Sequence, residues 1–109
     1  MTLAQIENDL KEGTLGGNPT LCATYRGWLA ATYSFEAGIL EEIMRRKALI
    51  WNEIRKNTKS DKSADRQYEA TQDGIDEQVI RLRMKRLEKL LSSLKTLIEI
   101  AEGQARSMY

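Results

Sequence analysis

A heptad repeat of apolar residues in the C-terminal third of the chain constrains its fold most. Between residues 75 and 108, apolar side chains recur at alternating steps of four and three residues. This spacing is typical of an α-helix that packs lengthwise against other helices. The sequence therefore predicts an all-α protein. Its predicted core or oligomer seam, here called the heptad seam, consists of Ile80, Met84, Leu87, Leu91, Leu94 and Ile98, and the repeat continues through Ala101, Ala105 and Met108.

Start and stop signals predict three helices before this one. Thr2 followed by Gln5 resembles a capping box, and Asn18 followed by Pro19 is a strong helix start. Glycines at 13, 16 and 17 separate these two helices. We expect helices over about residues 2–12, 19–57, 62–71 and 74–108, within a single domain of residues 1–109.

The connection around residues 57–74 leaves one alternative open. Residues 62–71 form either a separate short helix or the first turns of the last helix. Ser60 or Asp61 is the expected cap of the short helix, and Asp73 is the expected cap of the last helix.

Two long helices joined by a short connection predict an antiparallel hairpin. Val79, Leu82, Leu90, Leu97 and Ile100 lie beside the heptad seam and widen its apolar face. A lone hairpin leaves much of such a face in water. We therefore expect a homo-oligomer, with a dimer favoured, that completes the helical bundle.

The composition excludes several classes of function. The chain of 109 residues has no histidine and one cysteine, which removes histidine acid–base catalysis and histidine or thiolate metal sites. Apolar runs are short, so we expect neither secretion nor membrane insertion, and a cytoplasmic location. We expect a protein that is not an enzyme, with no catalytic residues, no metal and no cofactor.

The net charge of +1 conceals two basic clusters in the middle of the chain. They lie on either side of the predicted connection, so an antiparallel hairpin would merge them into one basic patch. The patch consists of Arg45, Arg46, Lys47, Arg55, Lys56, Lys59, Lys62 and Arg66 from the first cluster and Arg81, Arg83, Lys85, Arg86 and Lys89 from the second.

This basic patch has two interpretations. The cations can neutralise the phosphates of a nucleic acid while Trp51 or Tyr68 stacks on a base. Alternatively, they solvate exposed helix faces while Trp51 and Tyr68 belong to the core. DNA, RNA and an acidic protein surface all satisfy the first interpretation.

A resemblance to a group of small helical proteins encoded in bacteriophage genomes lies in the segments Ala48–Arg55, Ser60–Arg66, Tyr68–Thr71 and Lys85–Lys95, in Gly74, and in the ending Ala105–Tyr109. The likeness covers roughly residues 25–109. It implies a phage product in the bacterial cytoplasm that serves phage DNA replication and recombination. Alternatively, it implies an inhibitor of a bacterial antiviral defence system that binds a host protein or a signalling nucleotide. Under this resemblance, residues 60–74 form either a binding segment or only a capped connection.

Overall fold

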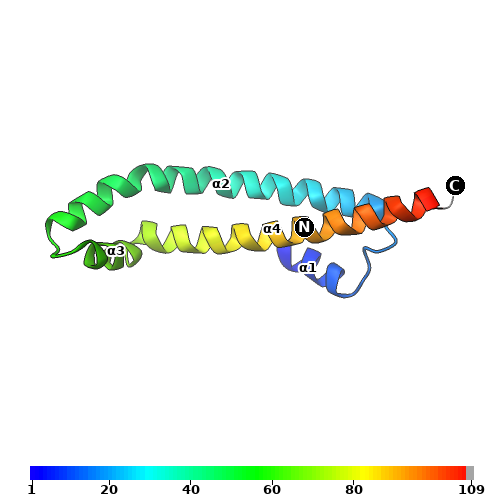
Figure 1. The fold of residues 1–109 in the computed structure, drawn as a ribbon, viewed down its shortest axis with the longest axis horizontal. Coiled ribbons are helices and arrows are strands. Elements are labelled where there is room, and N and C mark those ends of the chain that lie inside the picture. The colour runs from blue at the N-terminus through cyan, green and yellow to red at the C-terminus, as the bar shows by residue number, and fades with distance from the viewer. Residues whose placement is uncertain (108–109) are drawn as a thin grey trace. The chain divides into compact units, whose positions relative to one another are not determined.

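In the computed structural model, which describes residues 1–107 apart from the side chains of Ala105 and Ser107, the chain is all-helical, as predicted. The described residues form four α-helices and no strand (Figure 1). The predicted seam positions Ala105 and Met108, and the helix end at Met108, lie outside these descriptions. The helices are α1 (Leu3–Lys11), α2 (Pro19–Lys56), α3 (Asp61–Glu69) and α4 (Gln72–Ser107).

Side-chain caps determine where these helices begin. Thr2 Oγ1 accepts a hydrogen bond from Gln5 N at 3.2 Å, and Asn18 Oδ1 accepts one from Leu21 N at 3.0 Å. Ser60, one of the two expected caps of α3, accepts from Ser63 N. These bonds satisfy amides that have no partner within the first turn of a helix.

The start of α4 differs from the prediction. Thr71, not Asp73, caps this helix, because Thr71 Oγ1 accepts from Gly74 N at 3.1 Å and donates to Tyr68 O at 2.6 Å. Asp73 already lies within the first turn, where its carboxylate binds Arg46. The break at residues 70 and 71 makes α3 a separate helix.

Two glycines have definite structural roles. Gly13 has φ of 74° and ends α1 in a Schellman motif, in which Gly13 N donates to Leu10 O and Thr14 N donates to Asp9 O. Gly74 permits a close backbone approach, because a Cβ atom there would lie 2.1 Å from Tyr68 O. The end of α3 and the first turn of α4 can therefore meet only at a residue without a side chain.

The chain divides into two compact units, and α2 and α4 each contribute a segment to both. Unit 1 comprises Met1–Tyr33 and Lys85–Tyr109, and unit 2 comprises Ser34–Met84. The core of unit 1 joins α1, the loop after it, and the unit 1 segments of α2 and α4 (Figure 1). It contains Ile6, Leu15, Cys22, Tyr25, Leu29, Leu87, Leu90 and Leu94.

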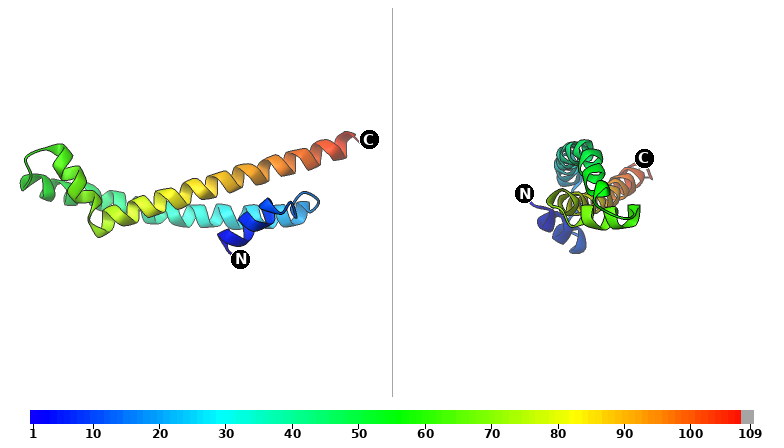
Figure 2. Two further views of the ribbon diagram at one scale, coloured as in Figure 1. Left: turned by 90° about the horizontal axis from the view of Figure 1, so that it is seen from below. Right: turned by 90° about the vertical axis from the view of Figure 1, so that its left-hand side faces the viewer.

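Unit 2 contains the reversal from α2 through α3 into α4 (Figure 2). Its buried side chains come from all three helices and include Ile43, Ala64, Tyr68 and Ile80. Within this unit the segments of α2 and α4 run in opposite directions, because Lys47 contacts Glu77 whereas the earlier residue Met44 contacts the later residue Arg81.

The heptad seam packs inside the chain. Ile80 is buried in unit 2, and Leu87 and Leu94 are buried in unit 1, while Met84, Leu91 and Ile98 are half-buried. None of the helices in the described part of the chain combines the length and apolar character that a membrane crossing requires.

Candidate functional site

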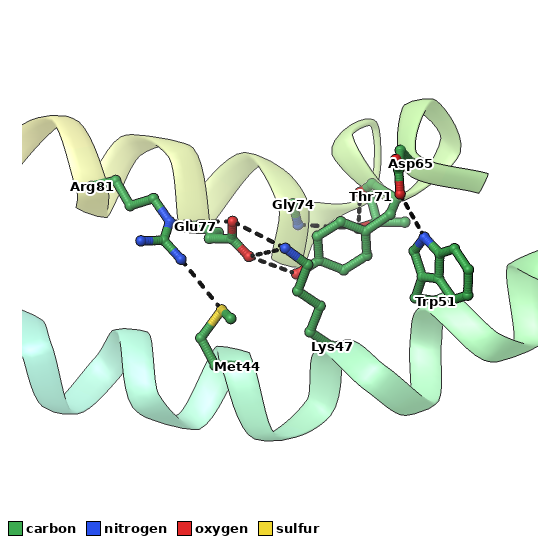
Figure 3. A network of polar contacts seen from close by, with 9 residues as sticks. Met44, Lys47, Trp51, Asp65, Thr71, Gly74, Glu77 and Arg81 are labelled. Carbon is green, nitrogen blue, oxygen red and sulfur yellow. Dashed lines mark hydrogen bonds and ion pairs between the residues drawn. The ribbon is translucent and has the colours of Figure 1, made fainter. Parts of the chain in front are cut away.

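The most connected polar group in unit 2 is the carboxylate of Glu77 on α4. Lys47 Nζ on α2 lies 3.2 Å from Glu77 Oε1 (Figure 3). The Tyr68 hydroxyl on α3 donates to the same oxygen at 3.3 Å. Arg81 Nε donates to Glu77 Oε2 at 3.3 Å. Lys47, Tyr68, Glu77 and Arg81, here called the Glu77 network, thus join all three helices of the unit.

Two pKa shifts follow from this arrangement. Burial by itself would raise the pKa of Glu77, but hydrogen bonds and charges from Lys47 and Arg81 outweigh it and hold the pKa below its ordinary value of 4.5. Burial, followed by the charge of Glu77 and the hydrogen bond to it, raises the pKa of Tyr68 to about 12. At neutral pH Glu77 is therefore ionised and Tyr68 keeps its proton.

The network borders a hollow of about 450 Å³. Two cations, Lys47 and Arg81, and three acids, Asp65, Glu69 and Glu77, line it. Both cations are already engaged by Glu77, and the Lys47 ammonium also lies 5.0 Å from the centre of the Tyr68 ring. No group of three or more metal-ligating side chains occurs among the described residues.

This geometry suits a clamp that fastens α3 to its neighbours. Trp51 Nε1 on α2 donates to Asp65 Oδ1 on α3 at 2.8 Å, and Arg55 Nε donates to Asp61 Oδ1 at 2.8 Å (the Trp51 contact is drawn in Figure 3). Tyr68 is buried and therefore has no free ring face for stacking, whereas Trp51 is half-buried.

We expect Glu77→Gln to destabilise the protein by about 1–2 kcal/mol at pH 7, because charge-assisted hydrogen bonds from Lys47 and Arg81 become neutral ones. The folded-state pKa of Glu77 is lowered, so its stabilisation is complete above the ordinary value of 4.5 and is lost as the pH falls through the lowered value. The difference between the wild-type and Glu77→Gln proteins should therefore shrink in acid. Urea midpoints measured between pH 7 and pH 3 test this.

The matched control is Glu69→Gln, since Glu69 lines the same hollow but is exposed and has no ion pair within the described residues. Its urea midpoint should stay close to wild type at every pH. A Glu77→Gln difference that stays constant down to pH 3 would show that the charge of Glu77 contributes nothing.

Only some cations of the predicted basic patch remain without an ion pair among the described residues. Eight of the thirteen cations form ion pairs with carboxylates, which neutralise them locally. They are Arg45 with Glu41, Arg46 with Asp73, Lys47 and Arg81 with Glu77, Arg55 with Asp61, Lys56 with Glu53, Arg83 with Glu36, and Arg86 with Glu7.

Within the described part of the chain, the other five cations have no ion pair, and all five are exposed. Lys59, Lys62 and Arg66 belong to unit 2, and Lys85 and Lys89 belong to unit 1. Lys62 and Arg66 lie one turn apart on α3, and Lys59 directly precedes its cap. Here these three residues are called the α3 cations.

Two features of unit 2 were missed by the sequence analysis. Glu36 is only 7% exposed, and its Oε1 lies 3.2 Å from Arg83 while its buried Oε2 has no hydrogen-bond partner in the described structure. Glu77, the centre of the Glu77 network, was not among the predicted site residues. The positions of Glu77, Lys47 and Tyr68 along the sequence gave no signal, because these residues meet only after the chain reverses.

Comparison of the chain with known proteins finds no matching family model, no matching curated protein and no matching solved structure.

Proposed function

We propose that this chain is a non-enzymatic helical protein that binds nucleic acid through the α3 cations. The observation that supports this is a contrast within unit 2. Lys59, Lys62 and Arg66 are exposed and have no carboxylate partner among the described residues, while neighbouring cations are neutralised. We further propose, from the resemblance to phage proteins alone, that this activity serves phage DNA replication or recombination in the cytoplasm of a bacterial host.

The local structure of α3 favours an anionic ligand. Of its three acids, Asp61 forms an ion pair with Arg55 and therefore opposes the α3 cations less than Asp65 and Glu69 do. The exposed amino end of a helix also carries partial positive charge. Trp51, half-buried beside α3, provides the only aromatic ring near these cations with part of its surface open, within the described residues.

Binding through the α3 cations predicts a shallow dependence on salt. Each phosphate contact on duplex DNA contributes a slope of about −0.9 to log affinity against log salt, so three contacts give a slope of about −3. Contacts from all thirteen cations of the predicted patch would instead give about −12. Fluorescence anisotropy of labelled single-stranded and duplex DNA at several salt concentrations measures this slope.

The double variant Lys62→Gln with Arg66→Gln should weaken binding and reduce the steepness of the slope by about two. Its matched control is Lys11→Gln with Arg26→Gln, which removes two exposed cations that have no ion pair within the described part of unit 1. Equal losses of affinity in the two variants would refute the placement on α3, and no binding at low salt would refute the proposed function.

A second candidate function is inhibition of a bacterial antiviral defence system. The observation that favours it is the small number of free cations together with the exposed apolar side chains Phe35 and Leu49 on α2. An acidic host protein with an apolar rim can contact both the unpaired cations and the exposed apolar side chains. A signalling nucleotide can contact the cations alone. Stoichiometric capture of one protein from a nuclease-treated lysate, lost in Lys62→Gln with Arg66→Gln, supports this candidate.

We also propose the arrangement of the whole chain as an antiparallel hairpin of α2 and α4, completed by a second copy. The opposite directions of the α2 and α4 segments inside unit 2 support the hairpin. Large apolar side chains that remain exposed on both long helices support the dimer.

A further inference from the structure

The segment of α4 in unit 2 has two apolar faces, and only one of them is covered. One face packs inside the unit through Gly74 and Ile80. The other carries Ile75, Val79 and Leu82, which are 46%, 46% and 62% exposed. Steps of four and three residues place these three side chains on one stripe of the helix, here called the α4 stripe.

Two charged residues accompany the α4 stripe on the same flank. Asp76 follows Ile75 and Arg83 follows Leu82, so the two charges are separated by about two turns. Asp76 accepts from the Gln72 amide and has no cation partner within the described residues. Arg83 uses one nitrogen on Glu36 and is 48% exposed, which leaves further donors of its guanidinium available.

We propose that the α4 stripe binds the α4 stripe of a second copy of this chain in an antiparallel orientation. A two-fold axis passes between Val79 and Leu82 and brings the charged flanks of the two helices together. The Asp76 end of one flank then lies beside the Arg83 end of the other. Asp76 of each copy then lies near Arg83 of the other, which gives two symmetric ion pairs beside the apolar contact. The inference rests on the proposed dimer and specifies its surface and orientation.

A parallel pairing lacks this complementarity. In that arrangement the charged flank of one copy meets the opposite flank of the other, where Gln78 and Leu82 offer Asp76 no cation.

The size of the α4 stripe limits the affinity of the dimer. Three apolar side chains per copy bury much less than the roughly 800 Å² per partner of a standard stable interface. The α4 stripe therefore fits a dimer that dissociates in the micromolar range.

Sedimentation velocity of the full chain from about 1 to 200 μM tests the surface. The wild-type protein should shift from monomer to dimer across this range, and Val79→Glu should weaken the dimer more than tenfold because it would bury a carboxylate. Leu49→Glu is the control, since Leu49 is also exposed but lies on α2. Circular dichroism confirms that both variants remain helical.

The outcomes distinguish a failure of the proposed dimer from a failure of the α4 stripe as its interface. A wild-type protein that stays monomeric at 200 μM overturns both the proposed dimer and the α4 stripe as its interface. A dimer that survives Val79→Glu, or is lost equally in Leu49→Glu, places the interface elsewhere.

Cysteine cross-linking tests the orientation. In the antiparallel dimer the two Val79 positions lie close to the axis, whereas the two Ile75 positions lie about 15 Å apart along the helices, beyond the reach of a disulfide. Val79→Cys should therefore form an interchain disulfide and Ile75→Cys should not. Equal cross-linking of the two variants would overturn the antiparallel order, because a parallel dimer brings both pairs together.

Discussion

Gly74→Ala is expected to destabilise unit 2 by about 3 kcal/mol or more, the upper end of overpacking costs. The added Cβ would lie 2.1 Å from Tyr68 O and 2.8 Å from Glu69 Cα, and both of these are backbone atoms. They cannot turn away as a flexible side chain can, so α3 must shift and strain its contacts with Trp51 and Glu77. A thermal melt followed by circular dichroism should show a midpoint lower by roughly 12 °C or more.

The matched control is Gly38→Ala, on the exposed face of α2 in the same unit. A Cβ at Gly38 would meet nothing within 4 Å, and alanine forms helix better than glycine. Gly38→Ala should therefore raise stability by about 0.5–1 kcal/mol. If Gly74→Ala also raised stability, the close approach of α3 to α4 would be wrong.

Leu29→Ala is expected to destabilise unit 1 by about 3–5 kcal/mol. The Leu29 side chain is 0% exposed and belongs to the cluster that joins α1, α2 and α4, so its truncation loses buried apolar surface and leaves a cavity. Unfolding in urea, followed by fluorescence in a Trp51→Phe background, measures the change beside this core, because Trp28 is then the sole tryptophan and packs against it.

Leu49→Ala makes the same truncation on the same helix at a side chain that is 72% exposed. It should change stability by less than about 0.5 kcal/mol. Similar losses in Leu29→Ala and Leu49→Ala would contradict the burial of Leu29 in the core of unit 1.

The all-helical class was predictable because its signals are local. The heptad seam is periodic along one helix, and Thr2, Asn18 and Ser60 cap the helix that directly follows each of them. Thr71 was missed as a cap because Asp73, two residues later, is by type the better capping residue. Choosing between them requires the contact of Thr71 with Tyr68 O.

Which cations of the predicted basic patch form ion pairs was not predictable from local sequence. Arg46 finds Asp73 and Arg83 finds Glu36 across the unit, and Arg86 pairs with Glu7 from the opposite end of the chain. Counting charges along the sequence adds cations that the fold then neutralises. Among the described residues the α3 cations form no such pairs, and two of the three acids of α3, Asp61 and Asp65, bind Arg55 and Trp51 instead.

The buried thiol of Cys22 makes unit 1 a reporter of its own opening. Cys22 lies in the unit 1 core, where its Sγ donates to Leu15 O at 3.4 Å, and the chain contains no other cysteine. A thiol reagent can react only when this core opens, so the rate of alkylation relative to that of a free thiol gives the free energy of local opening. The rate of Cys22 alkylation in the unmodified sequence therefore reports how often the core of unit 1 opens. No substitution is needed to measure it.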